Sequence, residues 1–234
     1  MTSSTSNREM RVLVTRPAGD ADRTAAIVQA HGHRAILAPL FIVKPYPHAP
    51  MGQADAYTAT SANALRALSF AGINLSKPLF AVGNATANEA AQRGFLDVRS
   101  ADGDGDDLCR LVRSELQTGA SLTYITGKPR NDAAIKALEQ TYTITTVETY
   151  ETIAADILPI TASAGLLEGE LDAVLHFSPR AAVVFAALVD QAGLAPQANQ
   201  LLHVFISHAA EQHCFSKRAV AAKPTLEAML KCLG

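Results

Sequence analysis

The residues best suited to chemistry stand directly after short β-rich runs, where helices are predicted to begin. Ligands of open parallel sheets bind beyond the carboxyl ends of the strands, and helix starts there favour carboxylates. The relevant segments are 15–17, 60–63, 83–86, 126–130, 178–180 and 207–208, and each carries Ser, Thr or Gly but no Asp or Glu. The pattern predicts a cleft for a ligand with several negative charges.

Helix capping is the alternative interpretation of each segment taken singly. Ser, Thr and Asn are ordinary N-caps, and Pro17, Pro129 and Pro179 suit a first helical turn. Asp is itself a favoured cap, so its absence from all of these segments favours the anion site over capping alone.

The strands and helices that position these segments can be predicted from alternating β-rich and helical patterns in the sequence. These patterns predict an α/β fold with parallel strands and a first helix over 20–30. Pro45 and Pro47 exclude a helix from 41–48, which predicts an extended linker there, and 146–154 is a second extended crossing. The expected strands are 11–15, 34–37, 56–59, 78–82, 121–125, 144–147, 172–177 and 203–206.

A weak internal duplication organises the chain in the order A-B-A′-B′. Residues 12–17 align with 122–127, 55–64 with 172–181, and 80–86 roughly with 203–210. Chance similarity between β-α turns is the alternative. The order predicts that B and A′ form one domain, and that A and B′ pair as the other.

Bulk composition excludes several classes of protein. The net charge of −2, the sparse aromatic residues and the absence of Trp argue against nucleic-acid binding, and 48% hydrophobic residues are typical of a globular protein. The apolar run 181–189 is too short to cross a bilayer, and the polar first ten residues predict a frayed terminus instead of a signal peptide. Three separated cysteines indicate reduced thiols and a cytoplasmic location, with no metal site.

The acidic segment 102–107 weakly resembles a calcium loop. The residue that should supply the bidentate carboxylate of such a loop is Arg113, so the spacing fails. Gly103 and Gly105 follow no clear strand and lack the third glycine of a dinucleotide site. We expect an acidic loop that caps a helix beginning near Asp106.

Five segments resemble the motifs of the uroporphyrinogen-III synthase family in order and spacing. They are 12–17, 60–63, 82–87, 149–152 and 177–181, and the likeness extends over almost the whole chain after residue 10. The resemblance implies two doubly wound parallel-sheet domains of α/β class joined by a two-stranded extended linker. The expected division is 1–42 plus 154–234 as one discontinuous domain, 48–147 as the other, and 43–47 and 148–153 as linker strands.

The family's reaction implies a function without a cofactor. Its substrate is hydroxymethylbilane, a linear tetrapyrrole with eight carboxylates, which closes to uroporphyrinogen III with the last pyrrole ring inverted through a spiro intermediate. By resemblance, Tyr150 is the candidate proton donor, and a tyrosine filling a hinge is its alternative. Thr86 matches a cleft threonine of the family, with first-turn capping as its alternative.

The predicted substrate contacts are of two kinds. Arg16, Lys128, Arg130 and Arg180 are expected to neutralise carboxylates, and Ser61, Asn63, Gly83, Gly127, Ser178 and Ser207 to frame backbone N–H donors. We expect a monomer without metal, nucleic-acid or membrane partners. Transient contact with neighbouring enzymes of the pathway stays open.

One turn departs from the family's pattern. Ile206–Ala210 has Ser207 where relatives commonly carry glycine, and it contains no threonine. This departure leaves open the alternative that the protein is a non-catalytic relative that binds tetrapyrroles or another polycarboxylate. A nucleotide-dependent enzyme is a third class, but the sequence has no phosphate-binding fingerprint to support it.

Overall fold

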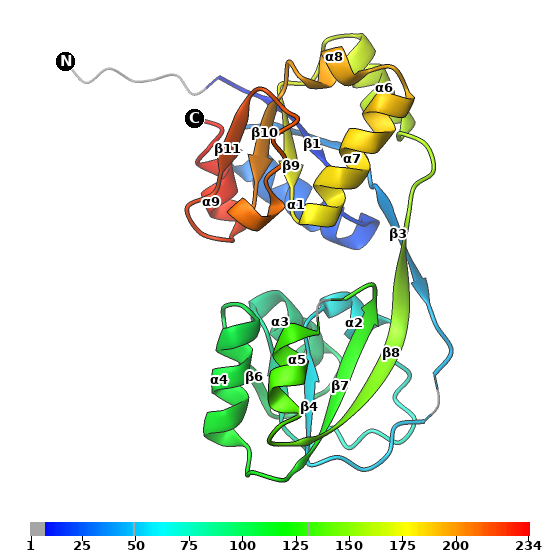
Figure 1. Ribbon diagram of the computed structural model, residues 1–234, viewed down its shortest axis with the longest axis vertical. Helices are drawn as coiled ribbons and strands as arrows, with labels where there is room; N and C mark the ends of the chain where they lie inside the picture. The colour runs from blue at the N-terminus through cyan, green and yellow to red at the C-terminus, as the bar shows by residue number, and fades with distance from the viewer. Residues whose placement is uncertain (1–7, 49, 131) are drawn as a thin grey trace, which may run out of the picture. The chain divides into compact units, whose positions relative to one another are not determined.

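The chain divides into two compact units (Figure 1). The computed structural model describes residues 8–48, 50–130 and 132–234, so part of the polar N-terminal segment, 1–7, lies outside the described residues. Unit 1 comprises Met1–Ile42 and Ile153–Gly234, and unit 2 comprises Val43–Thr152. Both boundaries fall within strands, β3 (Phe41–Pro45) and β8 (Thr143–Ala154), which therefore carry the chain from one unit to the other.

Unit 1 is a parallel sheet with helices on both faces. Its strand order is β11-β10-β9-β1-β2. Successive residues of β1 point to opposite faces, so Leu13 packs in one core with Phe185, and Val12 packs in another with Val28. The elements are β1 (Arg11–Val14), α1 (Ala18–Ala30), β2 (Arg34–Leu37), α6 (Ile160–Leu167), β9 (Ala173–His176), α7 (Pro179–Gln191), α8 (Ala195–Ala198), β10 (Leu202–Phe205), the 3-10 helix η1 (His208–Ala210), β11 (Arg218–Val220) and α9 (Leu226–Leu230).

Unit 2 repeats this architecture with the strand order β3-β8-β7-β4-β5-β6. Tyr124 and Leu108 belong to the core on one face, and Tyr57 and Leu65 to the core on the other. The remaining elements are β4 (Ala56–Ala59), α2 (Ala62–Arg66), β5 (Leu79–Ala81), α3 (Asn84–Gln92), β6 (Val98–Ser100), α4 (Gly105–Glu115), β7 (Ser121–Lys128) and α5 (Ala133–Leu138). The predicted α/β class with parallel sheets is confirmed.

The two sheets share one topology over five strands, and β3 is an additional edge strand of the second sheet. The order β11-β10-β9-β1-β2 corresponds strand for strand to β6-β5-β4-β7-β8. A matching hydrogen-bond pair starts the central ladder in each: Asp172 Oδ2 accepts from the Arg11 backbone N–H at 2.8 Å, and Asp55 Oδ2 accepts from the Ser121 N–H at 2.9 Å. The backbone N–H of each aspartate returns a bond to the partner's carbonyl. This correspondence agrees with the A-B-A′-B′ order.

The sequence analysis missed two strands, β6 and β11. Each has three residues and lies at an edge of its sheet, and none of the six residues is fully buried. The acidic segment 102–107 therefore follows a strand, contrary to expectation. As expected, it begins a helix: Asp104 caps α4 and forms a capping box with Asp107.

The described residues, 8–48, 50–130 and 132–234, contain neither a membrane-spanning helix nor a cluster of potential metal ligands. None of their helices is long and apolar enough to cross a membrane. None of their His, Cys, Asp and Glu side chains form a group of three or more that could hold a metal ion.

Candidate active site

A cavity of about 480 Å³ lies at the carboxyl ends of β4 and β7 in unit 2. This is the end of a parallel sheet at which ligands are expected to bind. The predicted residues Ser61, Gly127, Arg130 and Tyr150 are all part of its lining. The other lining residues are Thr60, Val82, Asp104, Gly105, Asp106, Thr126, Pro129, Ala133 and Ala134.

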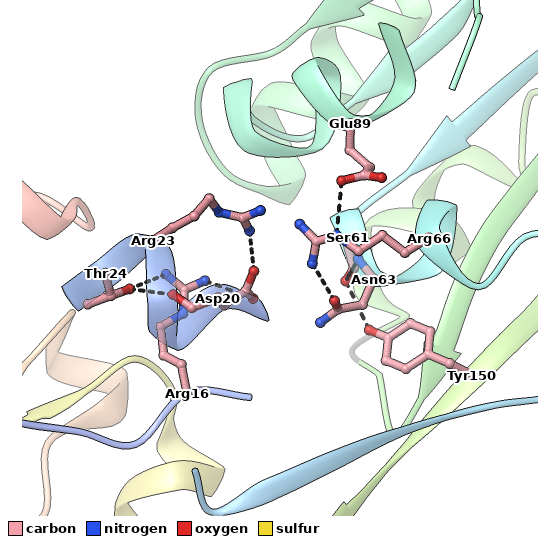
Figure 2. A network of polar contacts seen from close by, with 9 residues as sticks. All are labelled: Arg16, Asp20, Arg23, Thr24, Ser61, Asn63, Arg66, Glu89 and Tyr150. Carbon is pink, nitrogen blue, oxygen red and sulfur yellow. Dashed lines mark hydrogen bonds and ion pairs between the residues drawn. The ribbon is translucent and has the colours of Figure 1, made fainter. Parts of the chain in front are cut away.

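Tyr150 is part of the cavity lining, and its hydroxyl points toward Ser61 (Figure 2). Its Oη lies 3.0 Å from Ser61 Oγ, and that oxygen also accepts the Asn63 backbone N–H at 3.2 Å as the N-cap of α2. The tyrosine ring lies directly against Gly127, where a Cβ atom would stand 2.2 Å from Cε1 of Tyr150. Gly127 is therefore needed for this position of the ring.

A bulge in β8 turns Tyr150 toward the cavity. In the pairing of β7 with β8, Thr126 opposes Glu148 but Gly127 opposes Tyr150, which leaves Thr149 as the extra residue. Residues three apart face opposite sides of a regular strand, yet Val147 and Tyr150 pack in the same core. The extra residue at Thr149 shifts the alternation of side chains by one position, so that Val147 and Tyr150 face the same core. The buried Thr149 anchors the bulge, because its Oγ1 donates to the Ala64 carbonyl at 2.8 Å.

A second group of hydroxyls lies on the face of the sheet opposite Tyr150. Tyr124 Oη is 3.1 Å from Thr60 Oγ1 and 3.1 Å from Thr126 Oγ1. Thr60 and Thr126 both line the cavity, whereas Tyr124 is 1% exposed. The sequence analysis placed both threonines at helix starts but did not single out Tyr124. The one feature of the sequence that could have identified Tyr124 is the polar hydroxyl of a tyrosine within the predicted strand 121–125.

The two cations that follow the core of β7, Lys128 and Arg130, are paired with carboxylates of the same unit, and of the two only Arg130 is part of the described cavity lining. Lys128 Nζ lies 2.6 Å from Glu148, and Arg130 contacts Glu148 and, at 2.6 Å, Asp132. The hydrogen bond from Lys128 holds the pKa of the Glu148 carboxyl below its usual value. All four side chains remain between 24% and 53% exposed, so exchange of these pairs for another carboxylate costs little.

Four predicted residues of unit 2 lie outside the described lining of the cavity: Asn63, Gly83, Thr86 and Lys128. Asn63 Oδ1 accepts from Arg66 at 2.6 Å, and Arg66 also pairs with Glu89 at 2.9 Å (Figure 2). Gly83 is the N-cap of α3, and Thr86 is 5% exposed in the first turn of that helix. Asn63, Gly83 and Thr86 therefore occupy the positions of residues at the start of a helix.

The expectation of acid-free helix starts is wrong for this cavity. Asp104 and Asp106, at the start of α4, are part of its lining. This acidic helix start was predicted from the sequence, but its place at the cavity was not, because β6, the strand that brings it to the same edge of the sheet, was not predicted. The Asp104 carboxylate accepts from the backbone N–H groups of Asp106 and Asp107, where the helix dipole offsets part of its charge.

The predicted residues of unit 1 occupy the carboxyl ends of its strands. The Arg16 guanidinium lies 4.6 Å from the centre of the Phe177 ring and pairs with Asp20 at 3.2 Å (Figure 2). Arg180 lies over Phe41, with 4.7 Å between guanidinium and ring centre. Ser178 caps α7 by accepting the Ala181 N–H at 3.1 Å, and Ser207 precedes the short helix η1.

Fold and site together define the class of protein. Doubly wound α/β units with a cavity at the strand ends bind small molecules there. The chain belongs to the uroporphyrinogen-III synthase family, because the family model described as "Uroporphyrinogen-III synthase HemD" matches residues 22–231. The chain is thus an enzyme, a lyase of porphyrin and heme biosynthesis, and the resemblance found in its sequence is confirmed.

Solved structures of the same family share the fold. The crystal structure of uroporphyrinogen-III synthetase from Helicobacter pylori matches with a TM-score of 0.63 and 17% identity, over 96% of this chain and 98% of that chain. A mutant uroporphyrinogen III synthase from the extremely thermophilic bacterium Thermus thermophilus matches with a TM-score of 0.55 and 19% identity, over 95% and 96%. Among curated proteins, no sequence matches this chain.

Proposed function

We propose that this enzyme converts hydroxymethylbilane to uroporphyrinogen III without a metal or cofactor. Electrons of the first pyrrole nitrogen expel the terminal hydroxyl as water, which leaves an azafulvene electrophile. The substituted carbon of the last ring attacks the electrophilic carbon of the azafulvene and forms a spiro intermediate. This intermediate fragments and recloses with the last ring inverted. The protein must mainly hold one folded conformer of the substrate, which is a task of orientation.

The observation that carries the proposal is the position of the Tyr150 hydroxyl. Tyr150 and Ser61 both line the cavity, and the hydroxyl is held 3.0 Å from Ser61 Oγ, in a ring position that requires glycine at residue 127. Ser61 Oγ accepts two hydrogen bonds there and keeps its own proton. Rotation of two hydroxyl hydrogens lets Ser61 donate to Tyr150, and Tyr150 then donates to the departing hydroxyl of the substrate. Such assistance suffices for a leaving group that is already activated.

The cations supply the electrostatic part of substrate binding. In this proposal Lys128 and Arg130 exchange Glu148 for carboxylates of the substrate, at little cost because the pairs are partly exposed. Arg16 and Arg180 of unit 1 bind further carboxylates. Their planar guanidinium groups already lie over aromatic rings, which restricts their orientation.

Product analysis tests the proposal. The protein is incubated with freshly prepared hydroxymethylbilane, the products are oxidised to porphyrins, and isomers I and III are separated. We expect isomer III, because the unassisted reaction gives isomer I. Isomer I alone, with tight binding of the bilane, would instead indicate a non-catalytic relative. Isomer I without binding would overturn both interpretations.

The proposal also covers assembly and location. We propose a cytoplasmic monomer, and light scattering after size exclusion should then give about the chain mass of 24.7 kDa. Twice that mass would contradict the monomer. Extensive dialysis against a chelator should leave the formation of isomer III unchanged, and loss of activity that added metal restores would contradict the metal-free reaction.

A further inference from the structure

Tyr124 is a core residue whose hydroxyl reaches the wall of the cavity. Its ring packs with Leu108 and Val112 on the α4 face of the unit 2 sheet, and the side chain is 1% exposed. Its Oη lies 3.1 Å from both Thr60 Oγ1 and Thr126 Oγ1, two residues of the cavity lining. Thr126 is itself only 2% exposed, whereas Thr60 is partly exposed. A buried phenol therefore links two hydroxyls, one of which is open to a ligand.

The direction of these hydrogen bonds follows from the number of protons. Thr126 Oγ1 donates to Tyr124 Oη, with the Gly127 carbonyl as a longer second contact at 3.4 Å. With its oxygen engaged as an acceptor, Tyr124 has its phenol proton to give to Thr60. Phenols are also stronger donors than aliphatic alcohols. In the described part of the chain Thr60 Oγ1 has no second hydrogen-bond partner, so its own proton can be donated into the cavity.

We propose that Tyr124 is a positioning residue that makes the Thr60 hydroxyl a fixed donor to a carboxylate of the substrate. The inference rests on the proposed function and deepens it, because it adds a binding group on the face of the sheet opposite Tyr150. Thr60 follows β4 and precedes Ser61, so the two hydroxyls occupy opposite faces of one strand end. A donor held by a buried chain loses little freedom when it binds an anion.

Tyr142 provides a matched control in the same core. It is 5% exposed, packs in the same cluster as Tyr124, and its hydroxyl lies 3.2 Å from the Leu116 carbonyl. It is not part of the described lining of the cavity. Removal of either phenol oxygen perturbs the same core, but only removal from Tyr124 breaks the link to Thr60.

The test compares Tyr124→Phe with Tyr142→Phe, Thr60→Val and the double variant Tyr124→Phe/Thr60→Val. A hydrogen bond to a charged group affects binding about ten-fold, so we expect Tyr124→Phe to raise KM for hydroxymethylbilane by roughly five- to ten-fold and to change kcat little. Thr60→Val should do the same, and the double variant should add no further loss. Thr60→Ser, which keeps the hydroxyl, should restore most of the affinity lost in Thr60→Val.

Wild-type KM in Tyr124→Phe, or losses that multiply in the double variant, would overturn the inference. A fall in melting temperature shared by Tyr124→Phe and Tyr142→Phe, with KM unchanged in both, would assign Tyr124 a purely structural role and also overturn it. Failure of the proposed function is a different result, because the unmodified enzyme would then give no isomer III.

Discussion

The hydroxyl of Tyr150 lies 3.0 Å from Oγ of Ser61, a residue 89 positions earlier in the chain. This contact fixes the hydroxyl of the residue that we propose as the proton donor. We expect Tyr150→Phe to lower turnover about ten-fold or more, because the departing hydroxyl loses its acid while the ring still fills its site. Part of the substrate should then cyclise unaided, so the share of isomer I should rise. Steady-state rates and separation of the isomers measure both effects.

Tyr57→Phe is the control for this prediction. Tyr57 packs in the same core as Tyr150, and its hydroxyl accepts the Asn74 N–H at 3.0 Å. Its loss should reduce stability and leave the product unchanged. Wild-type turnover in Tyr150→Phe would remove this residue from the mechanism.

Gly127→Ala should displace Tyr150 without altering it. The added Cβ would stand 2.2 Å from Cε1 of the ring, so the ring must move. We expect turnover to fall as in Tyr150→Phe, with a loss of about 1–3 kcal/mol in the free energy of unfolding. Gly52→Ala is the matched control, because nothing lies within 4 Å of its added Cβ. Equal activity of both variants would show that the ring position is unimportant.

Glu148 restrains the cations proposed to bind the substrate. It pairs with both Lys128 and Arg130, so Glu148→Gln should leave more positive charge for the bilane. We expect KM to fall about two- to three-fold at low ionic strength, and the difference to vanish at high salt. Glu115→Gln, which breaks the pair with Arg99 instead, should leave KM unchanged. A higher KM in Glu148→Gln would indicate that the carboxylate orders the site.

A buried histidine pair should make unit 1 sensitive to acid. His176 Nε2 lies 3.0 Å from His203 Nδ1, and both side chains are fully buried. Burial lowers the pKa of His176 well below its usual value, with a further contribution from His203, and burial lowers the pKa of His203 to about 4. Below about pH 6.5 the unfolded chain binds protons that the folded chain does not. Stability should therefore be complete above that pH and fall as the pH drops toward 4.

Urea unfolding at several pH values measures this effect. The free energy of unfolding should fall by up to about 1.4 kcal/mol per pH unit for each histidine between pH 6.5 and 4. His176→Phe should reduce this slope, because it removes one of the two buried titratable groups. An unchanged slope in His176→Phe would contradict the assignment of this pH dependence to the histidine pair.

The sequence predicts the central strands well because burial dictates their composition. All four residues of β4 are buried, and its bounds, Ala56–Ala59, were predicted without error. The edge strands β6 and β11 lack this signal, since their pairing depends on a single neighbouring strand each. The cavity was consequently predicted without the acidic start of α4, which only β6 brings to it.

Several residues of the cavity lining were named from the sequence, but their contacts were not predicted. Ser61, Gly127 and Tyr150 were all named from the sequence, yet their meeting depends on the extra residue at Thr149. Local composition does not reveal such a bulge, because the bulge follows from the register between β7 and β8. The pairing of Lys128 with Glu148 arises from the same register, so it too was not foreseen.

The isomer composition formed from fresh hydroxymethylbilane tests the central claim most directly. In parallel reactions with and without the protein, the account predicts mainly isomer III with the protein and isomer I without it. It further predicts that Tyr150→Phe shifts the mixture toward isomer I while Tyr57→Phe does not. An identical mixture in the presence and absence of the wild-type protein would contradict the account.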